Sequence, residues 1–382
     1  MNTLFLSQSY RPVLGGLQAV VGELAEQFVQ KGHRVQVLTS RYPRTLSQRE
    51  TIANVSVERL LFLARRNYGK RLDLTLASQV IQTLTRWRLR QILCELRPKI
   101  INIHFPDQQV PFLLNIIKSS NARIVVSLHG DDVERFCEDS NSMTTQQRIA
   151  YARLAQLVLR ADAVTACSQS LLNKATALFP TIERRGHVIY NGIDLGRFDD
   201  TYCYGHPRPF VFALGRLTHK KGFDVLIDAW RVSGLGDEFD LLIAGSGEEY
   251  VSLQQRINTL RIISSIHLIG RATAQQVVHL LNACCFVAIP SRKEPFGLVA
   301  IEALGAGKPI MSTSVGGLKE ILDGSSNILV GATVEKVAQG LMSMVAKKAD
   351  WTDIGRKNRL LSQKFGMEQM VSTYESVLLP YA

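Results

Sequence analysis

Two carboxylates lie eight residues apart in the run Glu294-Pro-Phe-Gly-Leu-Val-Ala-Ile-Glu302, with almost nothing polar between them. Pro295 and Gly297 indicate a loop that enters a helix, and the residues that follow are apolar nearly all round, which predicts a largely buried helix. A buried carboxylate is costly unless it is paired or hydrogen-bonded. Glu302 therefore either occupies the one solvent-facing position of this helix or accepts hydrogen bonds from a ligand, with Glu294 at the helix entrance.

A second loop carries cations. The run Gly215-Arg-Leu-Thr-His-Lys-Lys-Gly222 follows a predicted strand and precedes a predicted helix, which places Arg216 and Lys221 five residues apart across a tight loop. Two cations beside a helix N-terminus are typical of a diphosphate-binding site. The alternative is a solvated basic loop with no ligand.

Three further loops carry candidate residues. Gly15 and Gly16 precede a predicted helix, where paired glycines let backbone amides approach a phosphate closely, although a plain helix-start turn has the same sequence. Gly245 opens a Gly-Ser-Gly run that is weak evidence by itself. His129 follows a strand and precedes a glycine, which suits either contact with a substrate or a structural hydrogen bond. No group of His, Cys and carboxylate residues has metal-ligand spacing, so we expect no metal site.

These loops need strands and helices to position them. Short apolar runs such as Ile100–His104, Phe210–Leu214 and Asp240–Ala244 alternate with helical patterns, in two series. This alternation predicts an α/β protein with parallel sheets and helices on both faces. We expect an N-terminal domain over residues 1–198, a linker over 199–209, a C-terminal domain over 210–365 and a helix over 366–382 that crosses back. Ligands of such domains bind beyond the carboxyl ends of the strands.

The composition fits a soluble globular protein of two domains: 382 residues, 46% hydrophobic and 20% charged, with a net charge of +12. No apolar run is long enough to cross a membrane and the N-terminus does not resemble a signal peptide, so we expect a cytoplasmic protein. Ten basic residues against two acidic ones crowd the stretch 59–99: Arg59, Arg65, Arg66, Lys70, Arg71, Arg86, Arg88, Arg90, Arg97 and Lys99. This stretch is either a basic amphipathic helix that contacts an anionic inner membrane face or an ordinary surface helix. No aromatic-interleaved basic motif points to nucleic acid.

In their order and spacing, these motifs resemble those of retaining glycosyltransferases of the GT-B fold, in glycosyltransferase family four (glycosyl transferases group 1). The resemblance spans nearly the whole chain and rests on Gly15-Gly16, His129-Gly-Asp131, Tyr190-Asn-Gly-Ile-Asp194, Gly215-Arg-Leu217, Lys221-Gly222, Gly245-Ser-Gly247, Glu294 to Glu302, and Gly316-Gly317. It implies two doubly wound Rossmann-like domains facing across a cleft. The first would bind the acceptor and the second the nucleotide sugar.

The resemblance also implies residue roles. Arg216 and Lys221 would bind the donor diphosphate, helped by the backbone around Gly15 and Gly16 and by the loop at Gly245.

On the sugar and nucleoside side, the resemblance implies that Glu302 holds the ribose hydroxyls. Glu294, with the backbone of Phe296-Gly297-Leu298, would hold the donor sugar. His129 would contact the sugar near the reacting carbon, and the base would lie near Ile269-Gly-Arg271.

The implied activity is retaining transfer of a hexose from a nucleotide diphosphate sugar, expected to be a UDP-sugar, to a hydroxyl of a glycan, lipid-linked or small-molecule acceptor. Two cations would neutralise the leaving diphosphate in place of a metal, so no metal and no cofactor are expected. One alternative is a nucleotide-sugar epimerase on the same fold, which would need further acid/base carboxylates. Another is an inactive nucleotide-sugar-binding protein, against which the presence of all the charged motif residues argues.

Overall fold

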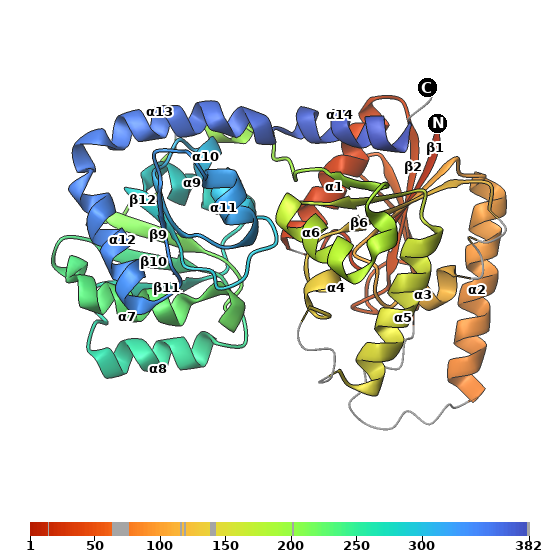
Figure 1. The fold of residues 1–382 in the computed structure, drawn as a ribbon, viewed down its shortest axis with the longest axis horizontal. Coiled ribbons are helices and arrows are strands. Elements are labelled where there is room, and N and C mark those ends of the chain that lie inside the picture. The colour runs from red at the N-terminus through yellow and green to blue at the C-terminus, as the bar shows by residue number, and fades with distance from the viewer. Residues whose placement is uncertain are drawn as a thin grey trace. The chain divides into compact units, whose positions relative to one another are not determined.

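The computed structural model describes the chain except residues 14, 63–75, 115–116, 118–119, 138–142, 201 and 380–382. It contains two compact units: Met1–Tyr190 with Met370–Ala382, and Asn191–Gln369. Each unit has its own sheet, with strands and helices alternating along the chain (Figure 1). The predicted α/β class is confirmed.

The first unit is built on an eight-stranded sheet in the order β3-β4-β2-β1-β5-β6-β7-β8. Its strands are β1 (Asn2–Ser7), β2 (Arg34–Ser40), β3 (Arg49–Ile52), β4 (Val55–Leu60), β5 (Ile100–His104), β6 (Arg123–Leu128), β7 (Ala163–Ala166) and β8 (Gly186–Val188). Its helices are α1 (Gly16–Gln30), α2 (Leu76–Leu96), α3 (Val110–Leu113), α4 (Asp131–Glu134), α5 (Thr145–Arg160), α6 (Gln169–Leu178) and most of α14 (Met367–Leu378).

The β3–β4 hairpin was not expected, and it makes the sheet mixed because β3 runs antiparallel to β4 at the edge. Ala53 and Asn54 form its two-residue loop, and both have positive φ angles of 47° and 65°. This is the backbone of a type I′ turn, which matches the twist of hairpin strands. This loop reads Ala53-Asn54 instead of the Asn-Gly or Asp-Gly pair that usually signals such a turn, so the hairpin was missed.

The second unit is built on a six-stranded parallel sheet in the order β11-β10-β9-β12-β13-β14. Its strands are β9 (Phe210–Leu214), β10 (Asp240–Ala244), β11 (Ile266–Gly270), β12 (Phe286–Ile289), β13 (Ile310–Thr313) and β14 (Ile328–Val330). Its helices are α7 (Phe223–Ser233), α8 (Tyr250–Leu260), α9 (Ala274–Ala283), α10 (Leu298–Gly305), α11 (Gly316–Leu322), α12 (Val334–Ala346) and α13 (Trp351–Ser362).

The core of this sheet explains why the strands are apolar throughout. Helices α7, α8 and α12 bury Trp230, Ile257 and Leu341 against one face, and α10 and α11 lie against the other (Figure 1). A strand buried on both faces reads as a continuous apolar run rather than an alternating one. The direction in which successive strands are added to the sheet reverses between β9 and β12. Ligands of such sheets bind at this point, beyond the carboxyl ends of the two strands.

The units divide at Tyr190–Asn191, earlier than the predicted boundary at residue 198. The predicted linker 199–209 lies inside the second unit because it is tied to α9: Asn282 donates to the carbonyl of Asp200, and the Tyr204 amide donates to the carbonyl of His279 at 3.1 Å. The chain returns to the first unit at Met370, within α14. Among the described helices, none is both long and apolar enough to cross a membrane.

Candidate functional site

Lys221 and Glu294, 73 residues apart in sequence, meet at the carboxyl ends of β9 and β12. Lys221 Nζ lies 2.5 Å from Glu294 Oε2, and Ser291 Oγ donates to the same oxygen at 3.3 Å. Both charged side chains are largely buried, with 21% and 11% of their surface exposed. The structure therefore brings together one predicted diphosphate-binding cation and the predicted sugar-binding carboxylate. Arg216 lies exposed at the other end of the same loop.

The loops after β9, β10 and β11 are joined backbone to backbone. The Gly215 amide donates to the Ala244 carbonyl at 3.1 Å, and the Leu217 amide to the Ser246 carbonyl at 3.0 Å. Gly245 has a φ of 148°, and a Cβ at this position would overlap the carbonyl oxygen of Gly215. This close approach gives the weak Gly-Ser-Gly signal a structural reason, since only glycine permits it.

The loop after β11 is tied to the same cluster of loops. Arg271 donates from Nε to Ser246 Oγ at 2.7 Å, and Ile269 is 36% exposed beside it. The region predicted to hold the nucleotide base is thus adjacent to the Gly245 loop. Whether it holds a base stays a prediction.

Helix α10 begins at Leu298, with Gly297 preceding it at φ 120°. Glu302 is then four residues into the helix, or about 6 Å along its axis. The helix is buried as predicted, with Ala300, Ile301 and Ala303 inside.

The Glu302 side chain is 19% exposed and accepts a hydrogen bond from Arg197 Nη2 at 2.6 Å. Burial raises the pKa of Glu302, and the Arg197 charge opposes the rise. The sequence reasoning missed Arg197, because it lies 105 residues away in a short 3₁₀ turn and carries no motif of its own.

The glycine pair Gly316-Gly317 packs against the backbone of the loop that carries Glu294. The Gly317 amide donates to the Glu294 carbonyl at 3.0 Å, and a Cβ on Gly317 would overlap the Phe296 carbonyl oxygen. Phe296 itself is buried and packs edge-on against Phe365 at 6.2 Å. These contacts hold the turn that leads into α10.

Arg292 is a second positioning residue that the sequence did not reveal. Its guanidinium forms a bidentate salt bridge with the Asp224 carboxylate, at 2.7 and 2.6 Å. The guanidinium also donates a hydrogen bond to the His219 carbonyl at 3.0 Å. Its backbone amide also donates to the Lys220 carbonyl at 2.8 Å. Arg292 therefore ties the loop carrying Glu294 to the loop carrying Lys221.

In the first unit, Gly15 and Gly16 lie exposed at the start of α1, as predicted. The N-cap residue of this helix is Gly15, which has no side chain to cap the first turn. The first turn of any helix leaves amide groups without intrahelical partners, and these favour an anion. The geometry fits the phosphate interpretation without testing it.

His129 follows β6 and shares a hydrogen bond with a second histidine. Its Nε2 lies 3.1 Å from Nδ1 of His104, which is fully buried on β5, and the two rings stack. Burial lowers the pKa of His129 to about 4. The pKa of His104 lies well below its usual value, because His104 is buried and because His129 is its neighbour. Both rings are therefore neutral at pH 7, and only one proton can lie between them.

The backbone at His129 is fixed by Asp132. This buried carboxylate accepts hydrogen bonds from the amides of His129, at 3.0 Å, and of Gly130, at 2.7 Å. Burial raises the pKa of Asp132 to about 6, although these hydrogen bonds favour the charged form. His129 is thus held through both its ring and its backbone, which confirms the structural hydrogen bond, while contact with a substrate stays a prediction.

These pKa shifts predict a pH-dependent stability. Because the pKa values of His104 and His129 are depressed in the folded protein, the unfolded chain binds more protons than the folded one between about pH 4 and 6.5. Through these two histidines, the free energy of unfolding therefore decreases as the pH falls through this window. Asp132 has the opposite sign, because its raised pKa favours the folded state as the pH falls below about 6. Glu26 and Glu302, whose pKa values burial also raises, act in the same direction as Asp132. His187, whose pKa burial lowers, acts with the two histidines. Because unfolded histidines bind protons between pH 7 and pH 5 and unfolded carboxyls do so mainly below pH 5, we expect the midpoint of thermal unfolding to fall from pH 7 to pH 5.

In the variant His129→Gln, the midpoint of thermal unfolding should fall less steeply over the same pH range. One histidine with a lowered pKa is gone, and the pKa of His104 is no longer lowered by a neighbouring His129. His219→Gln, at an exposed position, is the composition-matched control and should follow the wild type. Parallel curves for wild type and His129→Gln would contradict the assignment.

The fold defines a class: two Rossmann-like units in one chain, with the Lys221 and Glu294 loops at the carboxyl ends of strands in the second, fit the GT-B architecture. Comparison with known proteins agrees. The model for "Glycosyltransferase Family 4" matches residues 14–197, and that for "Glycosyl transferases group 1" matches residues 205–360. The chain belongs to this family and is a glycosyltransferase.

One relative and two solved structures match nearly the full length of the chain. The chain is 24% identical to N-acetyl-alpha-D-glucosaminyl L-malate synthase of Bacillus anthracis over 382 residues, covering 96% of this chain and 94% of the relative. Sucrose-phosphate synthase of Thermosynechococcus elongatus has a TM-score of 0.80 at 18% identity, covering 99% and 98% of the two chains. The Anabaena protein Alr3699/HepE, solved with UDP and glucose, has a TM-score of 0.74 at 20% identity and 99% coverage of both.

Proposed function

We propose that this glycosyltransferase moves a hexose from a UDP-sugar to an acceptor hydroxyl with retention of configuration and without a metal. The contact between Lys221 and Glu294 carries the proposal. It places a cation suited to a departing diphosphate directly beside a carboxylate suited to sugar hydroxyls, at the strand ends where ligands of such sheets bind. That a structurally similar protein is solved with UDP and glucose supports the choice of donor.

The proposed roles follow from charge. When the sugar–phosphate bond breaks, negative charge grows on the diphosphate, and Lys221 and Arg216 stabilise it where it develops. Glu294 orients the hexose through its hydroxyls, and Glu302 on α10 accepts hydrogen bonds from the ribose. The acceptor attacks the same face that the diphosphate leaves, and a phosphate oxygen takes the acceptor proton. His129, neutral at pH 7, contributes a hydrogen bond to the sugar rather than a proton.

Product analysis tests this proposal. A thermal-shift panel of UDP-, GDP- and ADP-sugars first identifies the donor, because only a ligand that binds the folded chain stabilises it. We expect the UDP-sugar to raise the midpoint most, and proton NMR of the product in the presence of EDTA to show the anomeric configuration of the donor. An inverted product excludes retention, and turnover abolished by EDTA excludes metal independence. Epimerised nucleotide sugar formed without an acceptor would favour the epimerase instead.

The acceptor side of the proposal concerns helix α2. Val80, Leu84 and Trp87 lie one helical turn apart and are 54%, 56% and 56% exposed, whereas Leu89 on another face is buried. Arg90 is exposed one turn beyond Trp87. Exposed apolar side chains flanked by arginine suit the surface of an anionic membrane. We therefore propose a lipid-linked or membrane-adjacent acceptor, reached by peripheral contact of α2.

The basic excess of this region is smaller at the surface than its sequence suggests. Arg88 is paired with the buried Glu58 at 2.7 Å, and Arg59 is itself buried, donating to the Arg11 carbonyl at 2.6 Å. Both are structural. Arg65, Arg66, Lys70 and Arg71 lie outside the described residues.

Vesicle flotation tests the membrane contact. We expect the wild type to float with vesicles containing phosphatidylglycerol and not with neutral ones, and expect Trp87→Ala with Arg90→Glu to abolish flotation while leaving turnover of a soluble acceptor unchanged. The matched control pairs Val232→Ala with Arg231→Glu, which alter an apolar side chain that is 63% exposed and an exposed arginine on α7. Equal flotation of the two double variants would exclude α2 as the contact.

A further inference from the structure

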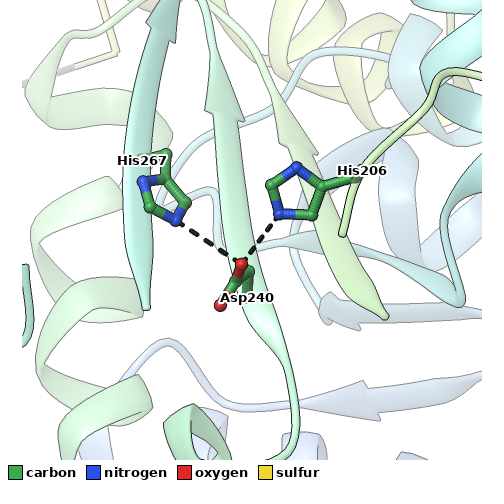
Figure 2. Close-up of side chains that lie close together, drawn as sticks. All are labelled: His206, Asp240 and His267. Carbon is green, nitrogen blue, oxygen red and sulfur yellow. Dashed lines mark hydrogen bonds and ion pairs between the residues drawn. The ribbon is translucent and has the colours of Figure 1, made fainter. Parts of the chain in front are cut away.

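Two histidines and an aspartate converge at the amino-terminal edge of the second sheet, away from every motif used above. Asp240 is the first residue of β10, His267 is the second residue of β11, and His206 lies four residues before β9. Figure 2 shows both imidazole rings directed at the Asp240 carboxylate. His206 Nε2 lies 2.8 Å and His267 Nε2 3.6 Å from the same oxygen, Asp240 Oδ2.

The three ligand atoms lie within 4.8 Å of one another, and no other group of three such residues in the described part of the chain is this compact. Ligands that share a tetrahedral zinc ion at bond lengths of about 2.0–2.1 Å are about 3.3–3.4 Å apart. The two histidine–aspartate separations, 2.8 and 3.6 Å, straddle this value, and the two imidazole nitrogens lie at most 4.8 Å apart, so the three ligand atoms reach one ion after side-chain shifts on the order of an ångström. From this geometry we propose that His206, Asp240 and His267 bind a divalent transition metal, zinc in the first instance.

The surroundings of Asp240 suit a metal ligand. The carboxylate is 5% exposed, and its second oxygen, Oδ1, accepts a hydrogen bond from Arg208 Nη1 at 2.8 Å. Arg208 is itself held by the carbonyls of Gly236 and Asp237, at 2.9 and 2.7 Å. A carboxylate ligand whose other oxygen is hydrogen-bonded is oriented in this way in many metal sites. The positive charge of Arg208 opposes a cation, so we expect moderate affinity rather than a tight structural site.

The ligand set identifies the metal class. Two imidazole nitrogens and one carboxylate oxygen suit zinc and its neighbours, whereas magnesium and calcium prefer an all-oxygen shell. Three protein ligands leave a fourth position of a tetrahedral ion to solvent, and His267, with 39% of its side chain exposed, opens the site to water.

The position in the fold separates this site from sugar transfer. Asp240 begins β10 and Gly245 follows its end, so the candidate metal site and the donor loops lie at opposite edges of one sheet. At about 3.3 Å per strand residue the two are roughly 15 Å apart along β10. A metal here would join three neighbouring segments of the sheet edge, and would stabilise the second unit instead of acting on the donor.

Zinc binding by the full chain tests the proposal. After treatment with EDTA and removal of the chelator, equilibrium dialysis against ZnCl2 should load one zinc ion per chain, and ZnCl2 should raise the thermal midpoint. His267→Gln, a partly exposed position, should keep the wild-type midpoint in EDTA but weaken zinc binding by at least about tenfold. His206→Gln should do the same. In all three proteins, turnover should be the same with and without zinc.

Two controls separate this site from adventitious binding. His279 contacts Asp200 at 3.1 Å and Gln275 at 2.9 Å, and it is not one of the three proposed ligands, so His279→Gln should retain the full response to zinc. Cys203→Ser should also retain it, and cobalt(II) bound in place of zinc should show no thiolate charge-transfer band. The proposal is overturned if wild type and His267→Gln bind zinc equally, or if binding is lost with Cys203→Ser instead.

Discussion

Replacing Lys221 by Met should lower kcat for sugar transfer by about 10²- to 10³-fold while KM for the donor changes much less. The amine stabilises charge that appears only as the bond to the diphosphate breaks, so its loss affects the transition state more than the bound substrate. Steady-state kinetics over a range of donor concentrations separates the two effects. Lys220→Met is the matched control, because it removes the same side chain from the next position of the same turn, and it should retain activity near that of wild type.

The contact with Glu294 makes the result more informative. Glu294→Gln keeps the size of the side chain but removes the charge that meets Lys221. If the two residues act on one substrate, the double variant should lose less activity than the product of the two single losses. If Lys221 only pairs with Glu294, its loss should lower the thermal midpoint and leave kcat close to that of Lys220→Met. That outcome would remove Lys221 from the proposed mechanism.

The second large effect concerns the ribose. Wild type should bind the nucleoside diphosphate about 10- to 100-fold more tightly than its 2′,3′-dideoxy analogue, since hydrogen bonds to a charged group contribute about 1.5–3 kcal/mol. In Glu302→Ala this preference should nearly vanish, because the carboxylate that accepts from the two hydroxyls is gone. Isothermal titration calorimetry with both nucleotides measures it without any knowledge of the sugar or the acceptor.

Arg197 supplies the control for this measurement. Arg197→Gln breaks the 2.6 Å contact but leaves the Glu302 carboxylate in place. This variant should lower the binding affinity for both nucleotides by the same factor, or leave both unchanged, and should keep the preference for the ribose hydroxyls. If instead Glu302→Ala weakens both nucleotides by the same factor, Glu302 serves only to pair with Arg197, and its assignment to the ribose is wrong.

The sequence predicted local features well because their causes are local. The strands at Ile100–His104, Phe210–Leu214 and Asp240–Ala244 have the predicted bounds, since each is a continuous apolar run between clear breaks. Strand β14, of three partly exposed residues, and the β3–β4 hairpin were missed because neither carries a strong signal.

The segment 199–209, predicted as a linker, shows a related limit. Prolines and weak periodicity indicate an irregular segment, but not whether that segment docks on a helix, as Asp200 does on α9.

The sequence by itself determined the family, the order of the motifs and the residue types offered to a ligand. Only the tertiary structure decided which of them touch. The partners in the contacts of Lys221 with Glu294 and of Arg197 with Glu302 are 73 and 105 residues apart. The physical reason is the crossover connection: strand order and register in a parallel sheet, not sequence distance, set which loops become neighbours.

The candidate metal ligands show the same limit most clearly. His206, Asp240 and His267 lie just before or at the start of three strands that are separated by long connections, so no spacing rule could join them. The sheet order β11-β10-β9 makes these strands adjacent and brings the three side chains to one point.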